Sequence, residues 1–272
     1  MAERVITAIG LTGRALSGSV DVALLVTDGE ARIVRKESLT FPLAGRRTGL
    51  ARAEAELTQR CADAVKHFLE NFALGRDVVG LIGFHAPEAA GTAETAECGE
   101  KLARATGIDV VYDFGAADRE AGGQGRPLAP VYHRALAEAA GLARPLAVVE
   151  TGDGATVTFI GEDGSLAVFS AGAAASAGSI ARIRQTLPAR PLLWLLAGEE
   201  PKRSSLFEAL AGLFPEPVHR AEEIGWPGEH FEAEAFAYLA VRSVKRLPLT
   251  YPGTTGVKAP VTGGRLARAP RR

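Results

Sequence analysis

The chain has 272 residues, of which 47% are hydrophobic, and its 31 basic and 32 acidic residues leave a formal net charge of -1. This length allows one large or two ordinary domains with a substantial apolar core. The balanced charge argues against binding to nucleic acid or to a membrane surface. Because the sequence has neither a secretion signal nor an apolar run long enough to span a bilayer, we expect a cytoplasmic protein.

A three-strand pattern with glycine-bearing turns occurs twice. The first copy predicts strands at residues 5–10, 21–27 and 31–34, and the second predicts strands at residues 146–150, 155–160 and 166–169. Helices and apolar strands alternate after each copy. This arrangement is typical of two-lobed sugar kinases that bind a nucleotide between the lobes, so we expect an α/β protein with two lobes.

Between the two copies, the spacing of apolar residues predicts helices and buried strands in alternation. The predicted helices cover residues 57–72, 95–105 and 130–141, and the predicted strands cover residues 78–83 and 109–112. Cys61 lies on the apolar face of the first of these helices, so we expect it in the core rather than in a metal site or a disulfide. The glycine-rich residues 121–127 break the periodicity. We expect the junction between the two lobes at this glycine-rich stretch, with an N-terminal lobe at residues 1–130 and a C-terminal lobe at residues 131–272.

After the second copy, we expect helices at residues 175–187 and 229–245 and a strand at 191–197. Ser205 and Glu208 have the spacing of a capping box for another helix, which would carry Leu206, Leu210 and Leu213 on one side. The last helix contains small residues that allow close packing on a sheet, namely Ala233, Ala235, Ala237 and Ala240. The tail after Leu247 is rich in Pro, Gly and Thr and ends in four arginines, so we expect it to be solvated and poorly ordered.

Three glycine turns could bind phosphate through backbone amides: residues 10–18, residues 151–154 and the stretch that begins at Gly198. None of them matches a Walker loop or a dinucleotide fingerprint. Each turn taken alone is as readily an ordinary β-turn. Their recurrence at matching places in the two lobes favours the phosphate interpretation.

Three stretches resemble the anhydro-N-acetylmuramic acid kinases. The residues that carry the resemblance are 10–13 and 20–24, then Asp113, Phe114, Asp118, 121–125, Pro127, Leu128, Pro130 and His133, and finally 232–242, 247–248 and 254–256. The resemblance implies two ribonuclease H-like lobes with a cleft between them, which is the actin-like ATPase fold. It also implies a homodimer.

The same resemblance implies the reaction. Family members use ATP and Mg²⁺ to phosphorylate the 6-oxygen of 1,6-anhydro-N-acetylmuramic acid while water opens the anhydro bridge, a step in peptidoglycan recycling. Positioning, charge stabilisation and a carboxylate that activates the water would supply the catalysis. The partners are therefore an amino sugar and a nucleotide.

The resemblance also implies the site residues. The expected nucleotide-binding residues are Gly10, Thr12, Gly13, Arg14, Ser17, Gly18, Asp21, Gly152, Gly154 and Gly198. The expected substrate-binding residues are His85, Asp113, Asp118, Gly123 and Gln124. Asp113 and Asp118 could instead be turn and cap residues, and Gln124 could satisfy loop backbone. His133 is more readily a hydrogen-bonded packing residue than a catalyst.

The chain departs from the family where the family has its catalytic aspartate, because Ser170 stands at that position. A serine hydroxyl does not accept a proton from water at neutral pH, and losing a general base removes about 10²- to 10⁴-fold of rate. Asp153 is the nearby carboxylate that could replace it, although a turn-tip carboxylate is more often merely exposed. Asp153, Glu199 and Glu200 would also repel ATP phosphates unless a metal lay between them. A long helical insertion before residue 191 is absent as well.

Two hypotheses follow. The chain is a kinase homologue with impaired catalysis, or it is a pseudokinase that binds a ligand or a partner without turnover.

Overall fold

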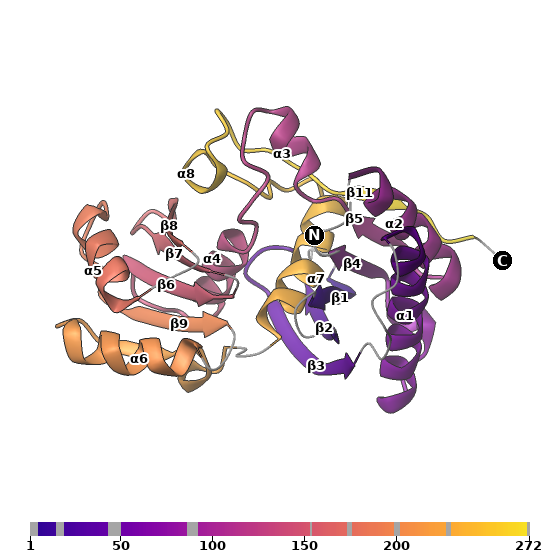
Figure 1. The fold of residues 1–272 in the computed structure, drawn as a ribbon, viewed down its shortest axis with the longest axis horizontal. Helices are drawn as coiled ribbons and strands as arrows, with labels where there is room; N and C mark the ends of the chain where they lie inside the picture. The colour runs from indigo at the N-terminus through magenta and orange to yellow at the C-terminus, as the bar shows by residue number, and fades with distance from the viewer. Residues whose placement is uncertain are drawn as a thin grey trace.

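The computed structural model describes residues 5–14, 19–42, 50–85, 92–152, 154–172, 176–198, 202–226 and 230–270. Two sheets form the centres of two lobes that lie side by side (Figure 1). Within the described residues, no helix combines the length and the apolar character needed to cross a bilayer.

The first sheet has the strand order β11-β5-β4-β1-β2-β3. Strands β1 (Ile6–Arg14), β2 (Ser19–Thr27) and β3 (Ile33–Pro42) form an antiparallel meander. Strands β4 (Leu81–His85) and β5 (Val110–Tyr112) continue the sheet in parallel with β1. Strand β11 (Arg265–Ala267) pairs with β5 in the antiparallel direction.

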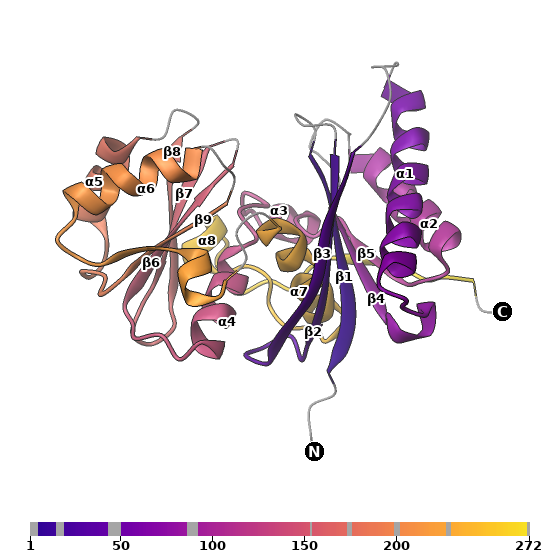
Figure 2. The ribbon, with the colours of Figure 1, turned by 90° about the horizontal axis from the view of Figure 1, so that it is seen from below.

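Helices cover both faces of the first sheet (Figure 2). Helices α1 (Leu50–Asn71) and α2 (Thr92–Thr106) lie on one face, and α7 (Phe231–Val244) lies on the other. Cys61 of α1 is fully buried in the cluster between α1, α2 and the sheet, as expected, and burial raises the pKa of its thiol to about 12.

The second sheet has the strand order β10-β9-β6-β7-β8. Strands β6 (Leu146–Thr151), β7 (Ala155–Ile160) and β8 (Leu166–Gly172) form the second meander, and β9 (Trp194–Gly198) and β10 (Val218–Arg220) extend it in parallel. Helices α5 (Ala177–Thr186) and α6 (Lys202–Leu213) cover the outer face, and α4 (Pro130–Ala139) covers part of the face toward the first lobe. The short elements are η1 (Arg76–Val78), α3 (Ala116–Glu120), η2 (Ala221–Ile224) and α8 (Pro252–Thr255).

Helix α7 lies against the first sheet at backbone distance. A Cβ atom built on Gly10 of β1 would lie 1.6 Å from the carbonyl oxygen of Ala233, and one built on Gly83 of β4 would lie 2.1 Å from that of Phe236. Real atoms do not approach so closely, so only glycine lets the helix reach the strands at these two points. This confirms the close packing that the small residues of α7 predict.

Helix α7 packs on the first sheet and β11 is its edge strand, although both come late in the chain. The expected division at residue 130 would place them in the second lobe, and that division stays a prediction. The contacts show that the chain returns to the first lobe after β10.

Several sequence expectations need correction. The strand expected at 31–34 is β3 and runs to Pro42, and the strand expected from residue 78 begins at Leu81 because residues 76–78 form a 3₁₀ turn. The capping box is wrong, since α6 begins at Lys202 and Ser205 lies inside the helix. Leu213 is 54% exposed instead of packed.

The expectation of a poorly ordered tail is also wrong for the described residues. The tail forms α8 and β11, and Arg268 donates a hydrogen bond to Asp109 at 2.6 Å. Strand β11 completes the edge of the first sheet by pairing with β5, which is why these residues are ordered.

We predict that Gly10→Ala destabilises the fold, because the added methyl group would meet the backbone of α7. The free energy of unfolding should fall by about 1–3 kcal/mol or more, measured by urea denaturation. Gly212→Ala in α6 is the matched control, since its Cβ would meet nothing within 4 Å. An equal effect of the two substitutions would contradict the packing described for α7.

Candidate functional site

A row of polar side chains crosses the first sheet near the ends of β1 and β4. Thr12 is the register partner of both His85 and Asp21, and Asp21 is the partner of Thr40. Directly paired residues point to the same face of a sheet. Because Gly10 lies two residues before Thr12 and contacts α7, this face is the one that α7 covers. We call His85, Thr12, Asp21 and Thr40 the β1 row.

The β1 row brings together three of the expected site residues. Asp21 is buried and accepts a hydrogen bond from the Thr40 hydroxyl at 2.6 Å. Thr12 is buried too, and within the described residues its hydroxyl has no hydrogen-bond partner. The His85 ring stacks on Phe236 of α7 with a centroid distance of 4.2 Å.

A second polar row crosses the second sheet. Glu150 of β6 is the register partner of Thr156, and Thr156 is the partner of Ser170. These residues share a face with Val148, which packs in the core cluster that contains residues of α4 and α7. We call Glu150, Thr156 and Ser170 the β6 row. It faces the first lobe, and the exposed Ser170 at its end accepts a hydrogen bond from the Gly172 amide at 3.3 Å.

Glu150 has the most perturbed carboxyl group of this region. Its side chain is 21% exposed, and its Oε2 lies 3.6 Å from Nε2 of His133 on α4. Burial, and then the charge of Glu232, raise the pKa of Glu150 to about 8. Glu150 is therefore mostly protonated at neutral pH.

His133 is fully buried, and burial lowers the pKa of its ring to about 3. Its Nδ1 lies 2.9 Å from the Thr158 hydroxyl, whereas within the described residues its Nε2 has no hydrogen-bond partner. The ring is thus neutral, and it packs and hydrogen-bonds as expected.

The first turn of α7 lies between the two rows. Its Glu232 approaches His85 of the β1 row, with 4.0 Å between Oε1 and Nε2. The charge of the same Glu232 also raises the pKa of Glu150 in the β6 row. The two rows therefore belong to one electrostatic environment. Sequence reasoning missed both glutamates.

The glycine turns of the second lobe meet at one end of its sheet. Gly198 of β9 pairs with Thr151 of β6, and a Cβ on Gly198 would lie 2.1 Å from the Thr151 carbonyl oxygen. The Gly152 amide donates to the Gly154 carbonyl at 2.8 Å. In the first lobe, Gly13 pairs with Val20 at the start of the β1–β2 hairpin.

Some expected site residues cannot be placed. Ser17, Gly18 and Asp153 lie outside the described residues, as does the side chain of Arg14. Glu199 and Glu200, which were expected to repel ATP phosphates, lie outside them too. Among the residues that are described, no group of three or more His, Cys, Asp or Glu side chains could hold a metal ion.

The remaining expected substrate residues form a separate cluster around the glycine-rich loop. Asp118 is buried and accepts hydrogen bonds from the Gly125 amide and the Thr255 hydroxyl, both at 2.6 Å. The backbone N–H of Gln124 donates to the backbone carbonyl of Thr255 at 3.0 Å. A Cβ atom built on Gly123 would lie 2.2 Å from the Asp118 carboxylate. Asp118 thus ties the loop to α8.

Asp113 lies next to this cluster with a positive φ of 50°. Its carboxylate pairs with Arg119 at 3.2 Å and with Arg265 at 3.4 Å. The following residue, Phe114, packs on Phe236, the ring that also stacks on His85. The cluster is thereby connected to the β1 row, and sugar binding by Asp113, Asp118, Gly123 and Gln124 stays a prediction.

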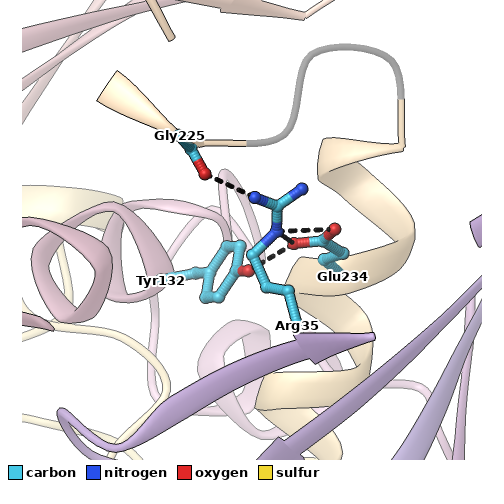
Figure 3. A network of polar contacts seen from close by, with 4 residues as sticks. All are labelled: Arg35, Tyr132, Gly225 and Glu234. Carbon is cyan, nitrogen blue, oxygen red and sulfur yellow. Dashed lines mark hydrogen bonds and ion pairs between the residues drawn. The ribbon is translucent and has the colours of Figure 1, made fainter. Parts of the chain in front are cut away.

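An ion pair between the partly exposed Arg35 and the buried Glu234 joins the elements beside the site (Figure 3). Arg35 of β3 donates from Nε to both carboxylate oxygens of Glu234 on α7, at 2.7 and 2.9 Å, and from Nη1 to the Gly225 carbonyl. The Tyr132 hydroxyl of α4 donates to Glu234 at 2.7 Å. Burial and the neighbouring Glu234 raise the pKa of Tyr132 well above its usual value, so the phenol stays a donor.

Two lobes, each with a meander extended by parallel strands and connected through helices, define a protein of the actin-like ATPase fold. A solved structure that shares this fold is the activator of the 2-hydroxyisocaproyl-CoA dehydratase from Clostridium difficile with bound ADPNP. Its TM-score is 0.50 at 10% identity, over 89% of this chain and 96% of that one.

Within this fold class, the chain belongs to the anhydro-N-acetylmuramic acid kinase family. The model of that family matches residues 35–179 and 173–269. The anhydro-N-acetylmuramic acid kinase of Rhizobium johnstonii is 33% identical over 368 positions, which cover 96% of this chain and 98% of the relative. That of Agrobacterium fabrum is 35% identical over 369 positions, which cover 97% and 99%.

The alignment with the Rhizobium johnstonii kinase is longer than this chain, with 368 positions against 272 residues. The relative therefore carries segments that have no counterpart here. The absence of a long helical insertion before residue 191 stays a prediction.

We predict that Glu150 makes stability depend on pH. Its folded pKa of about 8 lies above the ordinary 4.5, so its contribution to stability is full below pH 4.5 and is lost as the pH rises through 8. Between pH 5 and pH 8.5, the free energy of unfolding of the wild type should therefore decrease more than that of Glu150→Gln. The extra decrease should be on the order of 1 kcal/mol or more.

Urea unfolding at several pH values measures this difference. The ring of His133 titrates alike in both proteins and cancels. Glu162→Gln, an exposed change at the β7–β8 turn, is the control and should follow the wild type. A difference between wild type and Glu150→Gln that stays constant with pH would show that the Glu150 pKa is ordinary.

Proposed function

We propose that this protein uses ATP to phosphorylate 1,6-anhydro-N-acetylmuramic acid while water opens the anhydro bridge, giving N-acetylmuramic acid 6-phosphate. We propose further that it turns over more slowly at neutral pH than relatives with a carboxylate at the position of Ser170. The observation that carries the proposal is the pair of polar rows on opposite lobes, on either side of the first turn of α7. Family membership supports the choice of substrates.

The residues beside the glycine turns fit a magnesium-nucleotide. Thr12 has a buried hydroxyl without a partner among the described residues, which a phosphate oxygen could engage, and Asp21 beside it offers the carboxylate that Mg²⁺ prefers. A Cβ on Gly152 would meet nothing within 4 Å, so the β6–β7 turn leaves room for an anion. Thr12 and Asp21 would hold the nucleotide from the first lobe, and Gly152, Gly154 and Gly198 from the second. When bound, Mg²⁺ neutralises charge on the transferring phosphoryl group.

The sugar would lie near the first turn of α7. His85 is half-exposed, is held flat by Phe236 and carries its Nε2 beside Glu232, so it can contact a sugar hydroxyl. The loop around Gln124 is connected to this position, because Phe114, which precedes the loop, packs on Phe236, the ring that stacks on His85. A cytoplasmic location and a homodimer, both expected from the sequence, complete the proposal.

Two observations favour the alternative of binding without turnover. The β6 row ends in Ser170, whose hydroxyl cannot serve as a base at neutral pH, and the chain lacks segments that its relatives carry.

The experiment incubates purified protein with ATP, Mg²⁺ and the anhydro sugar at pH 7 to 9 and detects the 6-phosphate by mass spectrometry. Wild-type protein should give product above a no-enzyme control. Absence of product from the wild type at every pH, together with measurable sugar or nucleotide binding by calorimetry, would contradict the proposal and favour the pseudokinase.

We predict that Ser170→Asp raises the rate at pH 7 by about 10²-fold or more, because it restores a carboxylate on the face of the β6 row. Ser205→Asp on the exposed side of α6 is the matched control and should leave the rate unchanged. Equal rates for Ser170→Asp and the wild type would mean that this position has no part in proton transfer in this chain.

A further inference from the structure

We propose that Glu150, positioned by His133, is the group that takes the proton from the attacking water in this chain. This inference rests on the proposed function and adds the identity of the base. It assigns the role to a residue of β6 rather than to Ser170 of β8 or to Asp153.

The first support is the position of Glu150. It is the carboxylate of the β6 row and shares the face of the second sheet that carries Ser170. The two positions are two strands apart, which is roughly 10 Å at the usual strand spacing. Glu150 therefore does not take the place of Ser170. It shifts the base toward the first turn of α7, where Glu232 and His85 lie.

The second support is Nε2 of His133, which has no hydrogen-bond partner among the described residues. A fully buried ring nitrogen without a hydrogen-bond partner is costly, and Nε2 lies 3.6 Å from Glu150 Oε2. A small movement of the glutamate would complete this hydrogen bond, and catalytic hydrogen bonds are often long before substrates bind. In that arrangement His133 would hold one oxygen of Glu150, and the side chain, which is 21% exposed, would have its other oxygen free to take a proton.

The pair can accommodate either protonation state of Glu150. When the carboxyl is protonated, it donates to Nε2, and Nδ1–H donates to the Thr158 hydroxyl. When it is ionised, Nε2–H donates to the carboxylate, and the Thr158 hydroxyl donates to Nδ1. The ring stays neutral in both states, because burial disfavours its charged form.

The charged and titratable groups around Glu150 set the pH at which it can act. His133 on α4 is neutral, Glu232 on α7 opposes ionisation of Glu150, and His85 on β4 lies close to Glu232. Burial first, and then the charge of Glu232, raise the pKa of Glu150 to about 8. The active, ionised form therefore increases from pH 7 to pH 9, and slow turnover at neutral pH follows.

In the proposed step, each bond that forms replaces a bond that breaks. A Glu150 oxygen takes one proton of the water, and the water oxygen forms a bond to the anomeric carbon. The bond from that carbon to the 6-oxygen breaks, and its electron pair stays on the 6-oxygen. The 6-oxygen bonds to the γ-phosphorus of ATP, and ADP leaves with the electrons of the broken phosphorus–oxygen bond.

The test compares the pH dependence of kcat for wild type, Glu150→Gln and the control Glu162→Gln between pH 6 and 9.5. We expect the wild-type rate to rise about tenfold per pH unit until it levels off near pH 8, and Glu162→Gln to match it. Glu150→Gln, which keeps the shape of the side chain, should lose about 10²-fold or more at pH 8.5.

Two outcomes separate this inference from the proposed function. An active wild type with Glu150→Gln within threefold of it overturns the inference and leaves the proposed function intact. A wild type without product at any pH overturns the proposed function and the inference with it. As a fold check, Glu150→Gln must keep the native near-UV circular dichroism spectrum at pH 6.

A rescue experiment adds a second readout. Glu150→Gln combined with Ser170→Asp should recover activity, with a rate that no longer rises between pH 7 and 8. His133→Asn should move the pH midpoint of kcat, because the residue acts through the Glu150 carboxyl. For His133→Asn, a lower kcat with an unchanged pH midpoint would show that His133 only packs. For the double variant, activity no higher than that of Glu150→Gln would count against the idea that an aspartate at position 170 can replace Glu150 as the base.

Discussion

The arrangement of the two lobes depends on a buried carboxylate, that of Glu234 on α7. A charge in the interior needs close partners, and removing one of them leaves an uncompensated charge. Arg35 supplies two hydrogen bonds from β3, and Tyr132 supplies one from α4. The ion pair and the Tyr132 hydrogen bond together hold β3, α7 and α4 against one another where the lobes meet. Arg35 reaches further to the Gly225 carbonyl, which follows the last strand and turn of the second lobe.

Helix α7 passes this constraint to the site. Residues two apart on a helix point to roughly opposite sides, so the ion pair at Glu234 orients Glu232 away from it, toward His85 and Glu150. The glycines at positions 10 and 83 let the helix backbone rest on β1 and β4, which places its first turn beside the β1 row. The raised pKa of Glu150 thus follows first from its own burial and then from the way α7 places Glu232 near it.

Local patterns in the sequence were sufficient for most of the fold. The two meanders, the burial of Cys61 and the close packing of α7 follow from residue periodicity and size. The predictions that were wrong or incomplete concern residues whose environment depends on partners distant in the sequence. The C-terminal tail pairs with β5, and Asp118 bonds to Thr255, contacts that no local pattern records. Gly10 looked like part of a phosphate loop, and the structure gives it a packing reason.

The candidate site was predictable only in part. Thr12, Asp21 and His85 were expected as site residues and lie in one row, yet their common row depends on strand register. Glu150 was missed because the end of an apolar strand gives no sign of which face the residue takes, and Glu232 because a glutamate in the first turn of a helix is usual. Asp153, the base considered from sequence, lies outside the described residues.

A crystal structure with the anhydro sugar and a non-hydrolysable ATP analogue tests the central claim most directly. The claim is that the β1 row and the β6 row form one site around the first turn of α7. We predict that the nucleotide phosphates lie between Thr12 and the Gly152 turn, and that the sugar lies beside His85 with a water within hydrogen-bond reach of Glu150. A sugar bound away from both rows, or a water held by another carboxylate, would contradict it.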